Sequence, residues 1–425
     1  MRVSRFIAAR LAGSRQKTFT RTIIRLATAA VAISLAVMIV TVALVRGFKK
    51  EISEKVFGFW GHINITDIRA DASYEALPIY RDTALMASIL DVAQVELTTG
   101  LRHQIRLSSR GGVSHVQAVA QIPAIIKTGE QMEGIVLKGV GSDYAWETMQ
   151  RFLVAGTVFD PAVPADQSGI LISQYTADRL EVAPGDRFIL HFLREDRQVQ
   201  RRFEVRGIYR TGLEEYDQKF AFTPLPQVQA LLGWEEDQIA AYEVFVEHVD
   251  DAGIINEYIY VEELPSELYS ETIRQKFPNI FEWLDLQDVN QMVIVGLTLI
   301  VAVINMISVL LILILERTRM IGVLKALGGT SWMIQKIFLA HAGRIILIGL
   351  LIGNLIGLGL CAIQDSFRVI TLNEADYYLS YAPVDIGVWH ILALNSGTII
   401  ITLLFLLVPS LLITRITPVR TLRFA

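Results

Sequence analysis

The sequence contains only one cysteine, Cys361, so an intrachain disulfide bond is excluded in any redox compartment. This cysteine lies within an apolar run and is interpreted as a small buried hydrophobic residue. The seven histidines show neither an H-E-x-x-H pattern nor the paired spacing of zinc ligands, so we predict no metal site. A net charge of -4 is small for 425 residues and indicates neither nucleic-acid binding nor an acidic substrate.

Motifs for nucleotide and covalent chemistry are also missing from the sequence. No G-x-x-x-x-G-K-[ST] occurs, and Gly328-Gly329-Thr330-Ser331 lacks the lysine of a phosphate-binding loop. The chain is therefore not expected to hydrolyse ATP itself or to hold a cofactor. No G-x-S-x-G is present, and carboxylate pairs such as Glu214-Glu215 are more typical of solvated surface than of catalysis. An enzyme would need a constellation of residues that only folding assembles.

Long apolar runs dominate what is present. Hydrophobic residues make up 52% of the chain and charged residues 19%, which indicates a mixture of membrane-embedded and solvated parts. Four predominantly apolar runs are long enough to cross a hydrocarbon core of about 30 Å. We predict an α-helical membrane protein with transmembrane helices at residues 26–45, 292–315, 337–363 and 389–414.

Glycine recurs every fourth residue in the third run, which places a smooth stripe on one face of the helix. Another helix can approach closely along this stripe. These glycines are Gly349, Gly353 and Gly357. Uncharged polar residues also occur within the second and third runs, where interhelical hydrogen bonds are the first interpretation and a substrate path is the second. They are Asn305, Ser308 and Asn354.

Residues 46–291 have the composition of a large mixed α/β domain, with segments 46–57 and 278–291 as stalk helices. Alternating patterns predict strands at 62–68, 135–140, 169–172, 187–192, 202–209 and 241–247. Short helices are predicted at 173–180, 226–232 and 266–277. Segment 92–120 is predicted to be a hairpin that turns at Gly111-Gly112.

The distribution of charge predicts the topology. Segments 1–25, 316–336 and 415–425 are basic, whereas the short loop at 364–388 is acidic. The positive-inside rule then places both termini and segment 316–336 in the cytoplasm. The N-terminal segment is predicted to be an amphipathic helix, and the large domain is predicted to face the periplasm.

Segment 316–330 is a short basic and amphipathic stretch between two apolar runs. Its apolar residues recur at helical spacing, and Gly328-Gly329 is a helix stop. One interpretation is a membrane-surface loop that only fixes topology, and the other is a helix that docks onto a soluble partner. Periodicity alone does not decide between them.

Glu316-Arg317-Thr318-Arg319, followed by the stretch from Ile321 to Gly328, resembles a signature of the LolC/LolE permeases within the FtsX and MacB group of ABC transporter subunits. The resemblance implies that the segment is the coupling helix that contacts a separate ATPase. The coupling residues it implies are Glu316, Arg317, Arg319, Ile321, Leu324, Lys325, Leu327 and Gly328.

The large domain extends this resemblance. The stretches 203–209, 211–217 and 220–225 are similar to a motif of LolC/LolE-like permeases, and 180–186 is similar to their L-x-V-x-x-G-D turn. The motif residues are Gly207, Gly212, Glu215, Tyr216 and Asp217.

The sequence differs from the LolC pattern at the hairpin 192–202. LolC-type members carry a long proline-containing protrusion there that captures a lipoprotein carrier, whereas this hairpin is short and charged. The chain therefore looks more LolE-like, or like a permease that pairs with itself. The basic residues of this hairpin are interpreted either as solvated or as a contact for a partner protein. They are Arg194, Arg197, Arg201 and Arg202.

The resemblance implies a permease subunit in the bacterial inner membrane that pairs with a second permease and with an ATPase that binds ATP and magnesium. Its cargo would be lipoproteins, and a periplasmic lipoprotein carrier is a further candidate partner. We expect acyl chains to enter between the first two transmembrane helices, along Val37, Val40, Ile304 and Asn305. The alternatives are a MacB-like exporter of peptides or drugs and an FtsX-like scaffold that activates a cell-wall hydrolase.

Overall fold

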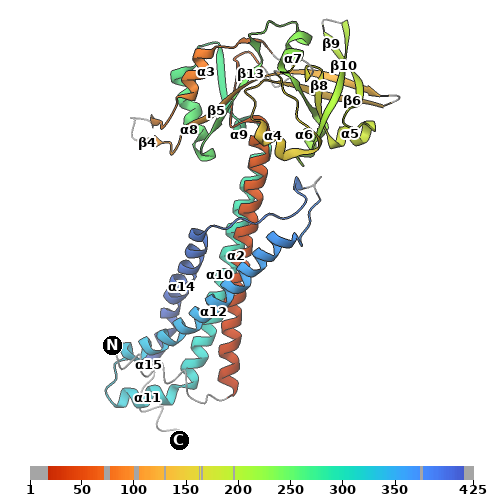
Figure 1. The fold of residues 1–425 in the computed structure, drawn as a ribbon. Coiled ribbons are helices and arrows are strands. Elements are labelled where there is room, and N and C mark those ends of the chain that lie inside the picture. Colours follow the sequence, from red (N-terminus) through yellow and green to blue (C-terminus); the bar gives the residue numbers. More distant parts are fainter. Residues whose placement is uncertain are drawn as a thin grey trace. The chain divides into compact units, whose positions relative to one another are not determined.

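The computed structural model describes residues 18–70, 77–99, 105–128, 131–161, 163, 166–194, 197–373 and 377–415. The described residues form two compact units, which Figure 1 shows as ribbons. The membrane unit comprises residues of Met1–Glu51, Trp283–Thr371 and Tyr381–Ala425, and the large domain comprises Ile52–Glu282 and Leu372–Ser380. Most of the predicted N-terminal helix and of the C-terminal tail lies outside the described residues.

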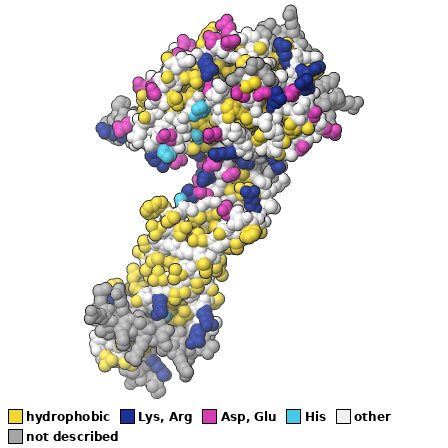
Figure 2. Space-filling model, viewed as in Figure 1, with side chains coloured by type: hydrophobic (Ala, Val, Ile, Leu, Met, Phe, Trp, Pro, Cys, Tyr) yellow, Lys and Arg dark blue, Asp and Glu magenta, His cyan; other side chains and the backbone are white. Residues whose placement is uncertain are grey.

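Within the described residues, four helices are long and apolar enough to span a membrane, as predicted. They are α2 (Thr18–Trp60), α10 (Pro278–Glu316), α12 (Ser331–Phe367) and α14 (Val388–Ser410). Two short helices, α11 (Thr318–Ala326) and α15 (Leu412–Arg415), follow α10 and α14. Hydrophobic side chains gather on the surface of the transmembrane helices, and charged side chains over the large domain (Figure 2).

Two of these helices extend well beyond their apolar runs. α2 continues through 46–57 to Trp60, and α10 begins at Pro278, so both segments that were expected to be stalks are helical. α2 contributes residues up to Glu51 to the membrane unit and Ile52–Trp60 to the large domain. An α-helix transmits displacement along its axis, because each turn is hydrogen-bonded to the next.

The glycine face of α12 packs against α2, which confirms the predicted close approach of another helix. A Cβ atom added at Gly353 would lie 2.7 Å from the carbonyl oxygen of Ala32, and one at Gly349 would lie 2.9 Å from the side chain of Val31. Gly357 approaches the next turn of α2 with similar distances. Larger side chains at these positions would push the two helices apart.

A pair of amides links α12 to α14. Asn354 Nδ2 donates to Asn395 Oδ1 at 2.8 Å, and Asn395 Nδ2 donates to Asn354 Oδ1 at 3.0 Å. The predicted interhelical hydrogen bond is thereby confirmed for Asn354. Ser308 instead donates to the carbonyl oxygen of Ile304 on its own helix, at 3.0 Å.

The described part of the large domain contains a ten-stranded mixed sheet in the order β14-β1-β13-β5-β6-β11-β8-β10-β7, with β9 pairing with β10 and β5. Its strands are β1 (Ile63–Asp67), β5 (Val113–Thr128), β6 (Gln131–Val140), β7 (Leu153–Gly156), β8 (Gly169–Ser173), β9 (Arg187–Arg194), β10 (Arg197–Tyr209), β11 (Phe220–Pro224), β13 (Ala241–Val246) and β14 (Leu268–Thr272). Apart from the parallel pairs β8–β10 and β6–β11, neighbouring strands are antiparallel.

Short strands and helices complete the domain and cover the buried core of the sheet (Figure 1). Short strands pair β2 (Ile79–Tyr80) with β12 (Gln238–Ile239), and β3 (Glu96–Thr99) with β4 (Ile105–Ser108). The helices are α3 (Thr83–Leu90), α4 (Trp146–Phe152), α5 (Gln174–Leu180), α6 (Glu214–Lys219), α7 (Leu225–Leu232), η2 (Val249–Asp251), α8 (Ala252–Tyr258), η3 (Ile259–Glu263) and α9 (Ile273–Lys276).

The hairpin predicted for 92–120 is wrong in its pairing. β3 pairs with β4 ahead of the two glycines, and β5 pairs with β6, β13 and β9 instead. Gly112 is required because its backbone lies against the carbonyl of Val92, where a Cβ atom would clash. The carboxylate of Asp251 accepts hydrogen bonds from the N–H groups of Arg110 and Gly111. A close approach of backbones therefore produced the same glycine signal as a hairpin turn.

The helix predicted over 266–277 is wrong in its first half. Residues Leu268–Thr272 form β14, which pairs with β1 at the edge of the sheet. The helix begins only after Thr272, because the Thr272 and Gln275 side chains form a capping box. Pairing with β1, which is distant in sequence, overrides the helical composition of the segment.

Candidate functional site

We call residues 316–330, for which the resemblance implies a coupling role, the coupling segment. It contains the short helix α11, and short non-helical turns separate α11 from α10 and from α12. At its start, Thr318 Oγ1 donates to the carbonyl oxygen of Leu315 at 2.5 Å. At its end, Gly328 adopts a positive φ of 87°. The N–H groups of Gly328 and Gly329 donate to the carbonyls of Lys325 and Leu324 at 3.0 Å and 2.8 Å, which is a Schellman cap. Glycine suits this turn because L side chains disfavour positive φ.

One face of α11 fixes the helix to its neighbours in the membrane unit. Ile321 is fully buried among the transmembrane helices, and Leu324 packs half-buried beside it. Lys325 Nζ donates to the carbonyl oxygens of Ile413 and Thr414 at 2.7 Å and 3.2 Å. Its positive charge thus meets the carbonyl end of α15, where a cation is favourable.

The opposite face of α11 is open to a partner. Val323 and Leu327 expose 46% and 80% of their surface, and Arg319 is also exposed. Glu316 and Gly328 are exposed at the two ends of the segment, while Arg317 is half-buried at the break before α11. The eight coupling residues therefore divide into an anchoring set and an exposed set. An exposed apolar pair beside an arginine has the composition of a protein interface.

The C-terminus of α2 is held in the core of the large domain. Lys138 Nζ donates to the carbonyl oxygen of Phe59 at 2.7 Å and forms an ion pair with Glu243 at 2.7 Å. Both charged side chains are fully buried, and Gln117 Nε2 donates to Glu243 at 2.7 Å. Burial lowers the pKa of Lys138, and the neighbouring Glu243 carboxylate opposes that shift.

Aromatic rings surround this α2 anchor, which we define as Phe59 and Trp60 with Lys138 and Glu243. The ring of Phe59 stacks on Tyr216 with centroids 4.9 Å apart and meets Phe222 edge to face at 5.3 Å. Lys138 Nζ lies 5.0 Å from the ring centroids of both Phe59 and Trp60. Sequence reasoning missed Lys138, because a single lysine in an alternating strand has the pattern of an exposed position.

His62 lies two residues after Trp60 of the α2 anchor and is buried in a neutral state. Its Nδ1 atom accepts a hydrogen bond from the Val246 N–H at 3.0 Å, so that nitrogen carries no proton. Burial lowers the pKa of His62 from 6.5 to about 4. An unfolded chain would protonate this histidine in mildly acidic solution, whereas the folded domain would not.

We expect acidification from pH 7 to pH 5 to lower the free energy of unfolding of the large domain by about 2 kcal/mol through His62. The sign follows because the depressed pKa makes the unfolded state bind more protons between pH 6.5 and 4. Thermal unfolding of the full chain in detergent at both pH values, with and without His62→Asn, measures this contribution. An unchanged pH dependence in His62→Asn would contradict it.

The motif residues of the large domain lie close to the α2 anchor. Asp217 is buried and accepts hydrogen bonds from Thr211 N, Thr211 Oγ1 and Gly212 N at 3.1, 2.7 and 3.0 Å. Burial raises the pKa of Asp217, while these hydrogen bonds lower it. Tyr216 stacks on Phe59, as described above. The motif therefore builds a rigid turn against the end of α2.

The other motif residues have separate roles. Gly212 has a positive φ of 75°, and a Cβ atom there would lie 2.6 Å from Lys55 Nζ on α2. Gly207 lets β10 approach the backbone of Thr157, since its Cβ atom would lie 2.8 Å from that carbonyl oxygen. Glu215 is exposed and pairs with Lys219 at 2.9 Å, one turn along α6.

The four residues expected to line a substrate path differ in exposure. Val37 on α2 and Ile304 on α10 expose 41% and 56% of their surface, whereas Val40 and Asn305 are half-buried. In the β9–β10 hairpin, Arg201 and Arg202 are exposed. Among the residues that the structure describes, no cluster of three or more histidine, cysteine or acidic side chains could hold a metal ion.

Comparisons with known proteins place these elements in a family context. The MacB-like periplasmic core domain model matches residues 26–262, and the FtsX-like permease C-terminal model matches residues 292–418. The chain is 20% identical over 410 residues to the lipoprotein-releasing system transmembrane protein LolC of Xylella fastidiosa, covering 93% of this chain and 92% of the relative. It is 19% identical over 445 residues to LolE of Haemophilus influenzae, covering 96% of each chain.

A solved structure of the periplasmic region of MacB from Actinobacillus actinomycetemcomitans also resembles part of the chain. The likeness covers 52% of this chain and 96% of that region, with 12% identity and a TM-score of 0.33.

Proposed function

Because the chain belongs to the LolC/LolE type of ABC transporter permease, we propose that it works with a separate ATPase to extract lipoproteins from the inner membrane. The relatives named above carry lipoprotein release in their names, and they match nearly the full length of the chain. The proposal includes a second permease, identical or different, because ABC transporters of this type work as permease pairs. Both termini and α11 would lie in the cytoplasm, and the large domain in the periplasm.

The physical task explains why an energy source is needed. Each buried CH₂ group of an acyl chain contributes about 0.8 kcal/mol, so one sixteen-carbon chain holds a protein to the membrane with roughly 12 kcal/mol. A lipoprotein with several such chains would leave the bilayer at a negligible rate. A permease that releases it must therefore move apolar surface against the hydrophobic effect.

The observation that best supports this mechanism is the continuity of α2, which runs from an apolar span to the α2 anchor as one helix. In the proposed mechanism, ATP-driven closure of the ATPase displaces α11 through its exposed face. Ile321 and Lys325 pass this displacement to the helices that they contact. α2 and α10 then carry it into the large domain, where Lys138 holds the end of α2.

Acyl chains of the cargo would leave the bilayer along α2 and α10. Val37 and Ile304 offer exposed apolar surface for this path, and Val40 and Asn305 lie beside them. The basic residues Arg201 and Arg202 are a candidate contact for a periplasmic partner such as a lipoprotein carrier.

A pull-down in mild detergent tests the proposed function. We expect the tagged chain, purified from its own host, to retain an ABC ATPase together with acylated proteins, identified by mass spectrometry. Recovery of the ATPase with a cell-wall hydrolase would favour an FtsX-like scaffold, and recovery with unacylated peptides would favour a MacB-like exporter. A strain depleted of the chain serves as the control and should accumulate the same acylated proteins in its inner membrane.

A further inference from the structure

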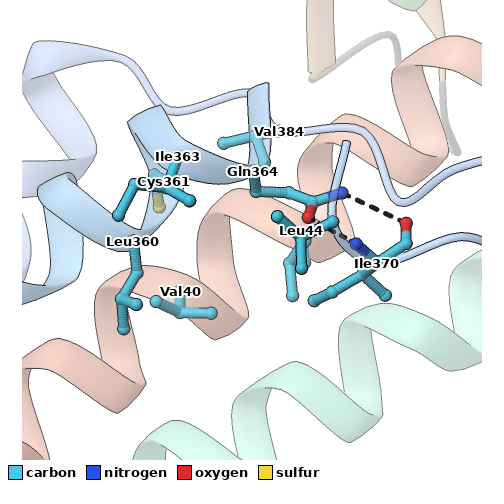
Figure 3. A pocket seen from close by; sticks show the side chains of 9 residues that line it. Val40, Leu44, Leu360, Cys361, Ile363, Gln364, Ile370 and Val384 are labelled. Carbon is cyan, nitrogen blue, oxygen red and sulfur yellow. Dashed lines mark hydrogen bonds between the residues drawn. The ribbon is translucent and has the colours of Figure 1, made fainter. Parts of the chain in front are cut away.

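A cavity of about 200 Å³ opens in the membrane unit between α2, the C-terminal part of α12 and the connecting segment, by which we mean the described residues between α12 and α14. In Figure 3, Val40 and Leu44 on α2 point toward side chains from α12 and the connecting segment. The lining is almost entirely apolar. It consists of Val40, Leu44, Leu360, Cys361, Ile363, Gln364, Val369, Ile370 and Val384.

The one polar lining residue, Gln364, serves to hold the wall in place. Its Nε2 atom donates to the carbonyl oxygens of Ile370 and Ala382 at 3.2 Å and 2.9 Å, and its Oε1 atom accepts from the Ile370 N–H at 2.8 Å. These bonds tie the connecting segment to α12 beside the cavity, and Figure 3 shows those with Ile370. With its amide engaged in this way, Gln364 leaves the interior suited to a hydrocarbon.

One end of the cavity is bordered by cations. Val384 lines the cavity, and the next residue, Asp385, donates its N–H to the carbonyl oxygen of Ala43 on α2 at 3.0 Å. Arg46 and Lys50, one turn apart on α2, both contact the carboxylate of Asp385, at 3.4 Å and 3.5 Å. Two positive charges thus share one negative charge there. Both contacts are long and partly exposed, so an added anion would compete with water and not with a strong ion pair.

Lys49 lies between Arg46 and Lys50 in the sequence but has a different set of acidic partners. Its Nζ atom contacts two carboxylates, Asp285 at 3.2 Å and Asp288 at 2.5 Å, both on α10. This lysine is neutralised by its own partners. In the described part of the chain, Arg46 and Lys50 thus have one carboxylate between them, whereas Lys49 has two.

From these observations we propose that the cavity binds one acyl chain of an anionic phospholipid, whose phosphate lies at Arg46 and Lys50. An apolar cavity of about 150 Å³ is large enough to take up a benzene molecule, so this cavity accommodates part of a single chain and not the several chains of a lipoprotein. The cations select the headgroup, and the apolar lining selects the chain. The lipid would join α2, α12 and the connecting segment, whichever cargo the protein moves.

Native mass spectrometry of the full chain in detergent tests the headgroup preference. Phosphatidylglycerol and phosphatidylcholine with identical acyl chains are titrated in parallel. We expect phosphatidylglycerol to bind about fivefold more tightly, the factor that one surface ion pair supplies. The preference should vanish in Arg46→Gln/Lys50→Gln and persist in the matched control Lys49→Gln. Equal binding of the two lipids to the unmodified chain would overturn the proposal.

The chain's only cysteine, Cys361, provides a second readout, because it lines the cavity and no other thiol reacts. The rate of alkylation by N-ethylmaleimide is measured in delipidated detergent solution. Phosphatidylglycerol at about four times its dissociation constant should slow the reaction by about fivefold, because only about one fifth of the cavities are then empty. Leu44→Trp, which fills the cavity, should abolish the binding of phosphatidylglycerol. Protection by inorganic phosphate alone, or retention of the lipid by Leu44→Trp, would show that no acyl chain occupies the cavity.

Discussion

Replacing the exposed Leu327 of the coupling segment with glutamate is expected to lower the amount of ATPase that copurifies with the permease by about tenfold or more, since an apolar anchor of an interface commonly contributes about 2 kcal/mol. Leu327 exposes 80% of its surface although it is large and apolar. In the proposed complex it would be buried against the ATPase, and a carboxylate there would lose its hydration without a partner. Quantitative mass spectrometry of the copurified ATPase measures the effect.

The matched control is Val388→Glu, which also places a carboxylate at an exposed apolar position of the membrane unit but lies at the first residue of α14, far from α11 in sequence. It should leave ATPase recovery unchanged. A Leu327→Glu protein that elutes as a single species from gel filtration and still recovers the full amount of ATPase would show that α11 is a topology-fixing surface loop. The proposed coupling mechanism would then be wrong.

The second large effect is expected at the α2 anchor. Lys138→Met should destabilise the large domain by about 3–5 kcal/mol, because it leaves the Glu243 carboxylate buried without its cation. It also removes the hydrogen bond that the Phe59 carbonyl accepts from Lys138 at the end of α2. For a domain of this size we expect the midpoint of thermal unfolding to fall by about 10 °C. Tryptophan fluorescence of the full chain in detergent can follow the transition.

The double variant Lys138→Met/Glu243→Gln should recover most of this loss, since a neutral glutamine removes the stranded charge and can still accept from Gln117. Lys219→Met is the matched control, because its ion pair with Glu215 is exposed and worth at most about 1 kcal/mol. If Lys138→Met and Lys219→Met had equal effects, the buried pair would not be what holds α2 in the large domain.

The double variant Lys138→Met/Glu243→Gln also tests the link between the α2 anchor and function. If the α2 anchor transmits displacement, the double variant should fold and still associate with the ATPase, because α11 is unchanged. Its recovery of ATPase separates a failure of docking from a failure of transmission. A change at Lys138 therefore tests the transmission of displacement without altering the surface of α11 that is proposed to bind the ATPase.

Where sequence reasoning succeeded, the signal was local and periodic. A bilayer requires about twenty apolar residues in a helix, so the four transmembrane helices could be predicted from composition alone. The helical period likewise placed Gly349, Gly353 and Gly357 on one face of α12, although only the structure identified α2 as the helix they contact. The hairpin of β9 and β10 could be predicted because its strands alternate and are adjacent in sequence.

Where sequence reasoning failed, the decisive contact joined residues that are distant in the chain. Nothing local distinguishes Lys138 from an exposed strand lysine, because its carboxylate partner, Glu243, lies on another strand. Leu268–Thr272 became a strand because β1 supplied hydrogen-bonding partners, and Gly111-Gly112 marked a backbone approach and not a hairpin turn.

The sequence by itself determined the membrane-spanning helices, the mixed α/β character of the large domain and the short helical segment after the second transmembrane helix, because these depend on local composition and periodicity. Only the tertiary structure decided that Ile321 and Lys325 anchor α11 while Leu327 is exposed. It also decided that α2 ends on a buried ion pair, and that an apolar cavity lies beside Arg46 and Lys50. Burial and charge pairing are properties of the packed chain, and packing brings together residues that no local pattern connects.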